Sequence, residues 1–266
     1  MISDSHIHTN FSGDSSEDPH NSVAQAIKLG MEEMCITDHH DFPLPLSISA
    51  EPLEVGPYVS YLQDLQRTYE KQIFVGVGIE LGLDPMCADA LADCARSYPW
   101  DFIIGSVHHV RAMDPYYPLF FEGKTEKQCF GEFFEATLEN LRAFSDFDTL
   151  GHLDYVVRYG PNKNKFYRPA DYFDIFDEIL RFLIDRGICL ECNVSALRRG
   201  LGQPNPHPDL LRRYRELGGE LITIGSDAHK AIDIGVPFDV GRDILLGAGF
   251  THYAVFKSRK PQMRKL

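Results

Sequence analysis

The sequence lacks any run of about 18 uncharged apolar residues, the length that a membrane-spanning helix needs. Its first ten residues, MISDSHIHTN, also lack the basic start and apolar stretch of a signal peptide. No segment rich in proline, glycine and serine divides the chain, and none has low complexity. These absences predict that residues 1–266 form a single domain with no membrane partner, and the cytoplasm is the expected location.

Basic residues are also scarce, because 26 lysines and arginines stand against 39 aspartates and glutamates and give a formal net charge of −13. Nucleic acids and anionic membranes attract basic surfaces, so this balance argues against both as partners. A small phosphorylated substrate is compatible with it, since bound metal ions would reverse the sign of the local field.

The six cysteines are scattered through a chain that is too large to need disulfide bonds, and free thiols are expected. Cys189 and Cys192 form a C-x-x-C pattern within ICLECNV. This segment is typical of a strand, in which these two side chains point to opposite faces. A redox role is therefore disfavoured.

Strand-like and helical patterns alternate along the chain. The strand-like runs cover residues 2–8, 33–39, 73–80, 101–109, 147–154, 187–194 and 220–229, with a further short run at 252–256. The helical patterns between them cover residues 21–29, 57–71, 84–96, 125–144, 169–186, 208–217 and 240–246. Seven such units predict the α/β class with a parallel sheet, and a distorted barrel accommodates seven strands better than an open sheet does. The proline-rich segment 42–57 is a candidate lid.

Side chains able to bind metal ions stand at the ends of successive strand-like runs. In chain order they are His6 and His8; Asp38, His39 and His40; Glu80; His108 and His109; His152 and Asp154; Glu191 and Asn193; and Asp227 and His229. In a β/α barrel these ends surround one mouth, where active sites lie. Because side chains alternate along a strand, His6 and His8 share a face, as do Asp227 and His229. Imidazole and carboxylate ligands suit zinc, iron or manganese.

A single histidine at a strand end is more often a hydrogen-bonded surface or core residue than a ligand. His20, His207 and His252 fit that ordinary interpretation. The other eight of the eleven histidines all stand at strand ends, which is hard to reach by chance. The whole ordered set of strand-end ligands therefore indicates a metal site, although H-x-H alone is a weak signal.

The ordered motifs D-S-H-I-H, S-G-D-S, T-D-H, G-I-E, G-S-V-H-H, G-H-L-D and S-D-A-H resemble those of the polymerase-and-histidinol-phosphatase (PHP) family. The resemblance extends from residue 3 to residue 229. The length and the segment ECNVSALRRGLGQPNPHPDLL are most similar to the histidinol-phosphatase branch. The family resemblance implies a distorted (β/α)7 barrel, similar to a TIM barrel, that holds three divalent metal ions.

The same resemblance implies the ligands of each ion. The first ion would be bound by His6, His8, Glu80 and Asp227, the second by Glu80, His108 and His152, and the third by Asp14, His39 and His229. Asp14 stands where some relatives carry a histidine, so the third site would have a carboxylate ligand in place of an imidazole. Family members use zinc, iron or manganese, and the sequence does not choose among these metals.

A site with three ions suits the hydrolysis of a phosphate monoester. The ions would carry +6, three carboxylates −3 and a bridging hydroxide −1, which leaves about +2 to meet the phosphate dianion. The hydroxide would attack phosphorus, Glu80 would bridge two ions, and Asp227 would accept a proton. His40 and His109 are candidate general acids, although each faces away from its neighbouring ligand in a regular strand.

Three arginines follow the strand-like runs 147–154 and 187–194 on the expected functional side of the barrel: Arg158, Arg198 and Arg199. Arginine binds phosphate through paired donors, so all three are candidates for substrate binding, although an isolated surface arginine is usually only solvated. The resemblance implies L-histidinol phosphate as the substrate and a step of histidine biosynthesis. The carboxylates of Asp41, Asp154 and Glu191 are candidates to pair with the amine of that substrate.

Three other interpretations remain open. The chain could be a PHP phosphoesterase for another small phosphate, such as a nucleotide or a sugar phosphate. It could be an amidohydrolase-like barrel, although no suitably placed lysine ends the strand-like run 101–109. It could also be a metal-binding barrel without catalysis, which the complete set of ligand positions disfavours. The sequence does not indicate an oligomeric state.

Overall fold

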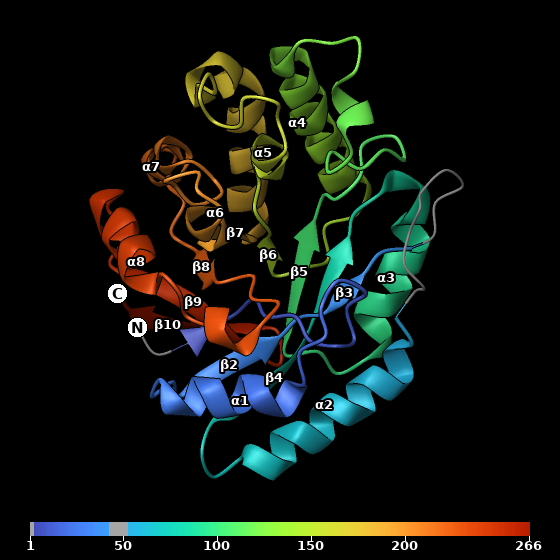
Figure 1. Ribbon diagram of the computed structural model, residues 1–266, viewed down its shortest axis with the longest axis vertical. Coiled ribbons are helices and arrows are strands. Elements are labelled where there is room, and N and C mark those ends of the chain that lie inside the picture. Colours follow the sequence, from blue (N-terminus) through green and yellow to red (C-terminus); the bar gives the residue numbers. More distant parts are fainter. Residues whose placement is uncertain (1–2, 43–52) are drawn as a thin grey trace.

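A computed structural model describes residues 3–42 and 53–266 as a mostly parallel sheet that curls into a nearly closed barrel, with helices around it (Figure 1). The strands of this sheet are β1 (Ser3–Asp4), β2 (Glu33–Ile36), β3 (His39–His40), β4 (Phe74–Gly82), β5 (Phe102–Ser106), β6 (Thr149–Leu150), β7 (Cys189–Asn193) and β8 (Ile222–Gly225). Each pairs in parallel with its neighbour in the order β1-β2-β4-β5-β6-β7-β8. Because β2 and β3 both pair with β4, they occupy one strand position, and the predicted seven-stranded α/β barrel is confirmed.

The first and last strands meet beyond their own ends. Ile7 forms a parallel bridge with Ala228. The amide of His8 donates to the carbonyl of Ala228 at 2.8 Å, and the amide of Ser5 donates to that of Ile224 at 3.3 Å. The segments that follow β1 and β8 therefore run side by side and carry their side chains to the mouth of the barrel.

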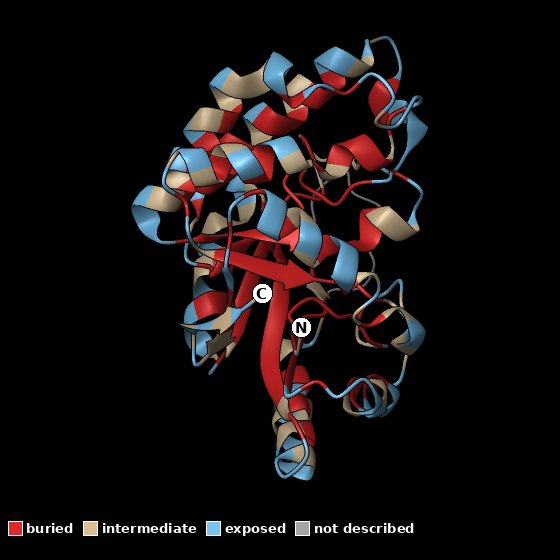
Figure 2. Ribbon diagram, turned by 90° about the vertical axis from the view of Figure 1, so that its left-hand side faces the viewer, coloured by how far each residue is buried: buried red, intermediate tan, exposed pale blue. Residues whose placement is uncertain are grey.

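Helices with one apolar face cover the outside of the barrel. They are α1 (Pro19–Lys28), α2 (Val55–Tyr69), α3 (Ala88–Ser97), α4 (Glu126–Ala143), α5 (Phe173–Arg186), α6 (Ser195–Arg198), α7 (Pro208–Glu216) and α8 (Phe238–Gly247). Short 3-10 turns are η1 (Pro85–Cys87), η2 (Pro118–Phe121), η3 (Tyr155–Arg158), η4 (Pro169–Tyr172) and η5 (Ala231–Asp233). In α5, the residues Phe176, Ile179, Leu180 and Leu183 recur at helical spacing and are all buried. Figure 2 shows that the strands are buried and that helices surround them, with the outer faces of these helices exposed.

A hairpin that was only half predicted closes the amino end of the barrel. The expected run at 252–256 is β9 (His252–Lys257), which pairs antiparallel with β10 (Lys260–Lys265). The sequence of β10, KPQMRK, has no apolar pattern that would predict a strand. The amide of Arg259 in the turn donates to the carbonyl of Asp101, and the rings of Phe256 and Phe102 lie 5.0 Å apart.

Most of the predicted strand-like runs are longer than the observed strands, whereas β4 and β9 extend one or two residues beyond theirs. The run at 2–8 contains only the two residues of β1, and the run at 220–229 contains β8. Residues beyond these strands leave the regular sheet and form the mouth. Most of the candidate lid 42–57 lies outside the described residues, which omit 43–52. Within the described ranges, every helix is too short or too polar to cross a bilayer.

Candidate metal centre

Glu80 lies at the centre of the mouth, and its two carboxylate oxygens face different sets of imidazoles, with Oε2 also 2.9 Å from Nδ1 of His39. Glu80 lies in β4 and is completely buried. Its Oε2 atom is 3.3 Å from Nε2 of His6 and 3.4 Å from Nε2 of His8. Its Oε1 atom is 3.1 Å from Nε2 of His152 and 3.4 Å from Nε2 of His108. A carboxylate in this position can bridge two ions.

Several atoms of this cluster are buried and have no hydrogen-bond partner among the residues that the structure describes. They are Nε2 of His6, Nε2 of His8, Nδ1 of His39 and Oε2 of Glu80. An unpartnered polar atom is costly to bury, so these atoms need a ligand of another kind. Nitrogen and oxygen ligands lie about 2 Å from a zinc ion, which separates neighbouring ligand atoms by roughly 3 Å. The observed spacings of 3.3–3.4 Å between Glu80 Oε2 and the two Nε2 atoms fit donors arranged around a cation.

Four overlapping groups of side chains bring their ligand atoms close enough to hold an ion. The groups are His6, His8 and Glu80; Glu80, His108 and His152; His8, His39 and His229; and His39, Asp41 and His108. The first two groups contain the ligands predicted for two of the ions except Asp227, and the third contains His39 and His229 with His8 in the place of Asp14. The mouth can therefore bind several metal ions.

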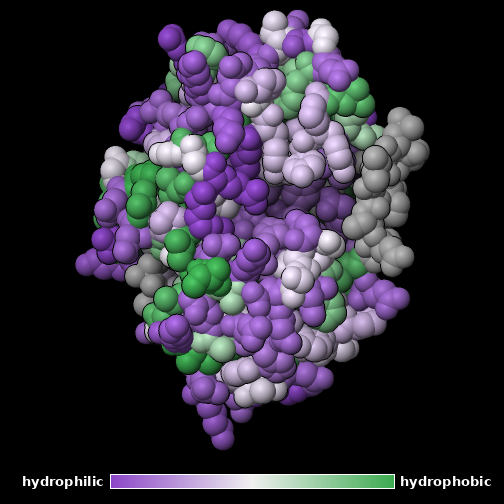
Figure 3. Space-filling model, viewed as in Figure 1, coloured by the Kyte–Doolittle hydropathy of each residue, from purple (hydrophilic) through white to green (hydrophobic). Residues whose placement is uncertain are grey.

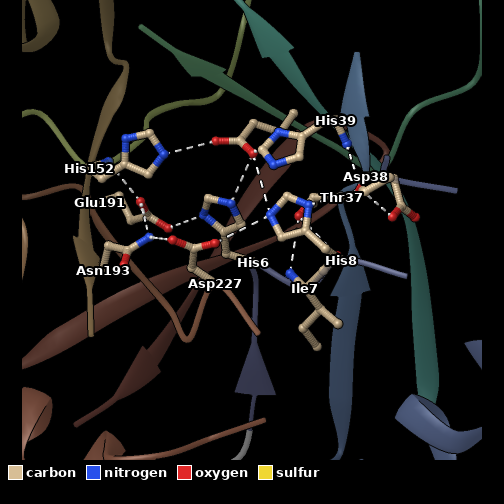
Figure 4. A network of polar contacts seen from close by, with 12 residues as sticks. His6, Ile7, His8, Thr37, Asp38, His39, His152, Glu191, Asn193 and Asp227 are labelled. Carbon is tan, nitrogen blue, oxygen red and sulfur yellow. Dashed lines mark hydrogen bonds and ion pairs between the residues drawn. The ribbon is translucent and has the colours of Figure 1, made fainter. Parts of the chain in front are cut away.

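Hydrogen bonds from Nδ1 fix the orientation of two of these imidazoles. Nδ1 of His6 donates to Oε1 of Glu191 at 2.6 Å. Nδ1 of His8 lies 3.1 Å from Oγ of Ser12, whose own proton goes to Asp38 at 2.7 Å, so the hydroxyl oxygen accepts from His8. Both contacts leave the Nε2 lone pair directed toward Glu80, as a metal ligand requires. Figure 4 shows the carboxylate of Glu191 beside the ring of His6.

His108 is oriented by a third carboxylate. Its Nδ1 atom lies 3.0 Å from Asp41. Burial lowers the pKa of His108, but the charges of Asp41 and Glu80 outweigh burial and raise that pKa to about 10. A negative field that holds a proton this strongly also attracts a metal cation.

Gly225 at the end of β8 allows His6 and Glu191 to meet. A Cβ atom at this position would collide with Cβ of His6 and with the carboxylate of Glu191. Any larger residue would therefore push the His6 imidazole out of position.

Asp227 reaches the cluster from a left-handed backbone conformation, with φ of 51°. Its Oδ1 atom is 3.5 Å from Nε2 of His8 and 3.6 Å from Nδ1 of His229. Its Oδ2 atom accepts hydrogen bonds from Arg158 at 3.1 Å and from Ser195 at 3.0 Å. Because β8 ends at Gly225, this turn, rather than the predicted strand alternation, directs Asp227 inward.

Asp14 completes the outer edge of the cluster, and its side chain is 59% exposed. Its Oδ2 atom is 2.9 Å from Nε2 of His229 and 3.7 Å from Nε2 of His39. The rings of His39 and His229 each stack on His8 at 4.2 Å. The structure thus brings together the three residues predicted for a third ion, at the more exposed side of the site.

The three predicted arginines lie in different surroundings. Arg158 is buried and uses three of its five N–H donors on Asn205, Asp227 and Asn193, so two donors remain without a partner in residues 3–42 and 53–266. Arg198 donates to the carbonyl of Ser226 at 2.8 Å and thereby supports the segment after β8. Arg199 is exposed.

The two candidate general acids lie apart from the cluster. The ring of His40 packs on Phe42 with centroids 4.5 Å apart. His109 lines a separate cavity with Met86 and Asn140. The contacts recorded for residues 3–42 and 53–266 join neither imidazole to Glu80, as expected from strand alternation.

The carboxylates that were expected to meet a substrate amine instead hold protein groups. Glu191 and Asp41 accept from metal-site histidines, and Asp154 accepts from the amide of His207 at 2.9 Å. Sequence reasoning also missed Ser12 and Asn205, which no pattern distinguishes from ordinary loop residues.

Comparisons with known proteins agree with this geometry. The model of the PHP domain family matches residues 4–195. A histidinol-phosphatase of Lactococcus lactis is 33% identical over 98% of this chain and 97% of its own length. A histidinol-phosphatase of Bacillus subtilis is 24% identical over 89% of this chain and 96% of its own.

Solved structures share the fold. Histidinol phosphate phosphatase of Lactococcus lactis, complexed with zinc, L-histidinol and phosphate, aligns with a TM-score of 0.90 and 32% identity, covering 98% of both chains. A chain from Listeria monocytogenes aligns with a TM-score of 0.76 at 18% identity, covers 90% of this chain and 99% of its own, and supports the fold alone. The chain belongs to the PHP domain family, among the histidinol-phosphatases.

Proposed function

We propose that this protein hydrolyses L-histidinol phosphate to L-histidinol and phosphate, and thereby acts in histidine biosynthesis. The observation that carries the proposal is the buried Glu80 carboxylate, whose two oxygens both face several imidazoles. The relative from Lactococcus lactis, similar over nearly the whole chain, supports the choice of substrate.

We assign the ligands as three sets. They are His6, His8, Glu80 and Asp227; Glu80, His108 and His152; and Asp14, His39 and His229. The contacts of Glu80, Asp227 and Asp14 support these sets. Bound zinc, iron or manganese would polarise phosphoryl oxygens and make water a nucleophile near neutral pH.

The chain's own residues would move protons and bind the phosphate. Asp227 is the proposed acceptor of the proton from the attacking water, because Oδ1 faces the cluster while Arg158 and Ser195 hold Oδ2. The two free N–H donors of Arg158 would bind the phosphate beside Asp227. Arg198 would have to release the carbonyl of Ser226 before it could bind substrate. Arg199 would bind substrate from its exposed position.

The contacts of His40 and His109 assign the role of general acid to neither residue. To donate a proton to the leaving group, His40 or His109 would need to turn toward the cluster. Residues 1–266 as one domain, a cytoplasmic location and the absence of a nucleic-acid partner also stay predictions.

A panel of phosphate monoesters tests the substrate. Phosphate release is measured with L-histidinol phosphate, a nucleoside monophosphate, a sugar phosphate and an aryl phosphate, each with and without prior removal of metal by a chelator. We expect the highest kcat/KM for L-histidinol phosphate and loss of turnover without metal. Equal turnover of the aryl phosphate would refute the specific substrate, and preference for a nucleotide or sugar phosphate would favour that alternative.

A further inference from the structure

A row of tyrosines leads from the metal centre to the surface. The ring of Tyr155 lies 4.8 Å from that of His152 and 5.7 Å from that of His108. The ring of Tyr159 lies 5.0 Å from that of Tyr155, and the ring of Tyr116 lies 5.5 Å from that of Tyr159. Consecutive rings are thus spaced for aromatic contact all the way from a proposed ligand to solvent.

The exposure of these rings increases outward. Tyr155 and Tyr159 are half-buried, whereas Tyr116 is 60% exposed. Tyr116 is held in place by Asp114, whose carboxylate accepts from the Tyr116 amide at 2.7 Å. Figure 3 shows a hollow in the surface near the ends of β3 and β5. Pale side chains, whose hydropathy is intermediate, line the rim of this hollow next to the segment between β5 and α4.

The opposite end of the centre has a different chemistry. The imidazoles form a row in which the rings of His152 and His6 are 5.9 Å apart, those of His6 and His8 5.0 Å, and those of His8 and His229 4.2 Å. The far end of this row meets the exposed carboxylate of Asp14. The site is therefore polarised, with tyrosines at the His152 end and a carboxylate at the His229 end.

We infer that Tyr159 and Tyr116 form the subsite that holds the planar ring of the substrate's leaving group and so determine specificity. This inference rests on the proposed function, in which the phosphate occupies the metal centre and an imidazole ring extends from it. A flat heteroaromatic ring gains stacking with tyrosine, and a protonated ring gains attraction to its π-face. An aliphatic leaving group gains neither.

The test compares two substrates that share an amino-alcohol phosphate. L-Histidinol phosphate carries the ring, and 2-aminoethyl phosphate lacks it. In Tyr159→Leu we expect the ratio of kcat/KM for the two substrates to fall about tenfold, mainly through a higher KM for the ring substrate. Tyr159→Phe, which keeps the ring, should restore most of this ratio. Tyr116→Ala provides a second variant at an exposed position where folding is not at risk.

The metal content of every variant is also measured, so that a loss of metal ions is distinguished from an effect on substrate binding. An unchanged ratio in Tyr159→Leu and Tyr116→Ala would overturn the inference. An equal loss for both substrates, or a loss in Tyr159→Phe as large as in Tyr159→Leu, would also overturn it, because the tyrosine would then act through the fold or its hydroxyl. If the wild-type protein shows no preference for L-histidinol phosphate, the proposed function itself fails.

Discussion

Both ends of the barrel bury carboxylates, but the partners of these carboxylates differ. At the amino end, Asp148 accepts from Nε of Arg259 at 3.1 and 3.2 Å and from the amide of Ile103 at 2.8 Å. Glu33 accepts from Arg264 at 2.7 Å. At the carboxyl end, the partners of Glu80 are imidazoles, and one of its oxygens lacks a hydrogen-bond donor.

The difference separates a structural ion pair from a metal site. A guanidinium brings a permanent charge and its own N–H donors, so the carboxylates of the hairpin end are satisfied by the protein alone. Imidazoles whose Nδ1 protons are directed elsewhere offer lone pairs toward Glu80, and lone pairs facing a carboxylate need a cation between them. Each of the following predictions disturbs one end and leaves the other intact.

The largest expected effect is the loss of a proposed ligand at the carboxyl end. Asp227→Ala or His8→Ala should lower kcat/KM for L-histidinol phosphate about 10³-fold or more, because ions supply several kcal/mol of transition-state stabilisation. Phosphate release is the measurement, with circular dichroism as the control for folding. A folded variant that keeps a tenth of the wild-type activity would contradict the assignment.

Glu191→Gln should have the next largest effect, without removing any proposed ligand. The neutral amide holds Nδ1 of His6 more weakly than the carboxylate does, so zinc affinity should fall about 10- to 100-fold. Competition with a chromophoric chelator measures this affinity. Glu220→Gln, at a side chain that is 73% exposed, is the matched control and should bind zinc like the wild type. Equal affinities for both variants would show that Glu191 does not position His6.

Arg259→Ala disturbs the amino end, and its effect should depend on pH. Burial raises the pKa of Asp148 to about 6, and Arg259 opposes this rise. Above pH 6 the variant leaves a buried anion without its partner, whereas near pH 5 most of the carboxyl is protonated and needs none. The unfolding free energy should therefore fall by about 1–3 kcal/mol at pH 8 and by less at pH 5.

Urea unfolding of Arg259→Ala and the wild type at both pH values measures this difference. Arg142→Ala, whose partner Glu178 is 59% exposed, should change stability by less than about 0.5 kcal/mol at either pH. Turnover by folded Arg259→Ala should remain close to that of the wild type. A loss of stability that is larger at pH 5 than at pH 8 would refute the role given to Asp148.

The smallest effect on turnover is expected for Cys189→Ser, two residues from Glu191 in the same strand. Cys189 is buried at the start of β7 with no disulfide. A hydroxyl there should lower the free energy of unfolding by about 1 kcal/mol and leave kcat/KM nearly unchanged. A large loss of turnover with normal folding would show that the two ends of this strand are not independent.

The sequence was sufficient to predict the barrel and nearly all of the cluster. The alternation of strand-like and helical patterns predicts parallel strands, and in a barrel the residues that follow them must meet at one mouth. His6, His108 and His152 could thus be placed together although they are far apart in the chain. The division of these residues among three ions came from the family resemblance, as did Asp14, which follows no strand end.

The remaining features depend on tertiary contacts that leave no local pattern. Glu191 could be seen to lie near the mouth, but its hydrogen bond to His6 depends on the close approach at Gly225. The polar sequence of β10 becomes a strand only because it pairs with β9. The tyrosines Tyr116 and Tyr159 come from different segments, and their contact is set by the turn around Asp114.

Metal analysis of the purified, zinc-loaded protein is the most direct test of the whole account. The carboxyl end of the barrel should hold about three ions per chain, and Glu80→Gln should retain clearly fewer because it weakens two sites together. A wild-type protein that binds one ion or none, or a Glu80→Gln variant that binds as many ions as the wild type, would contradict the central claim.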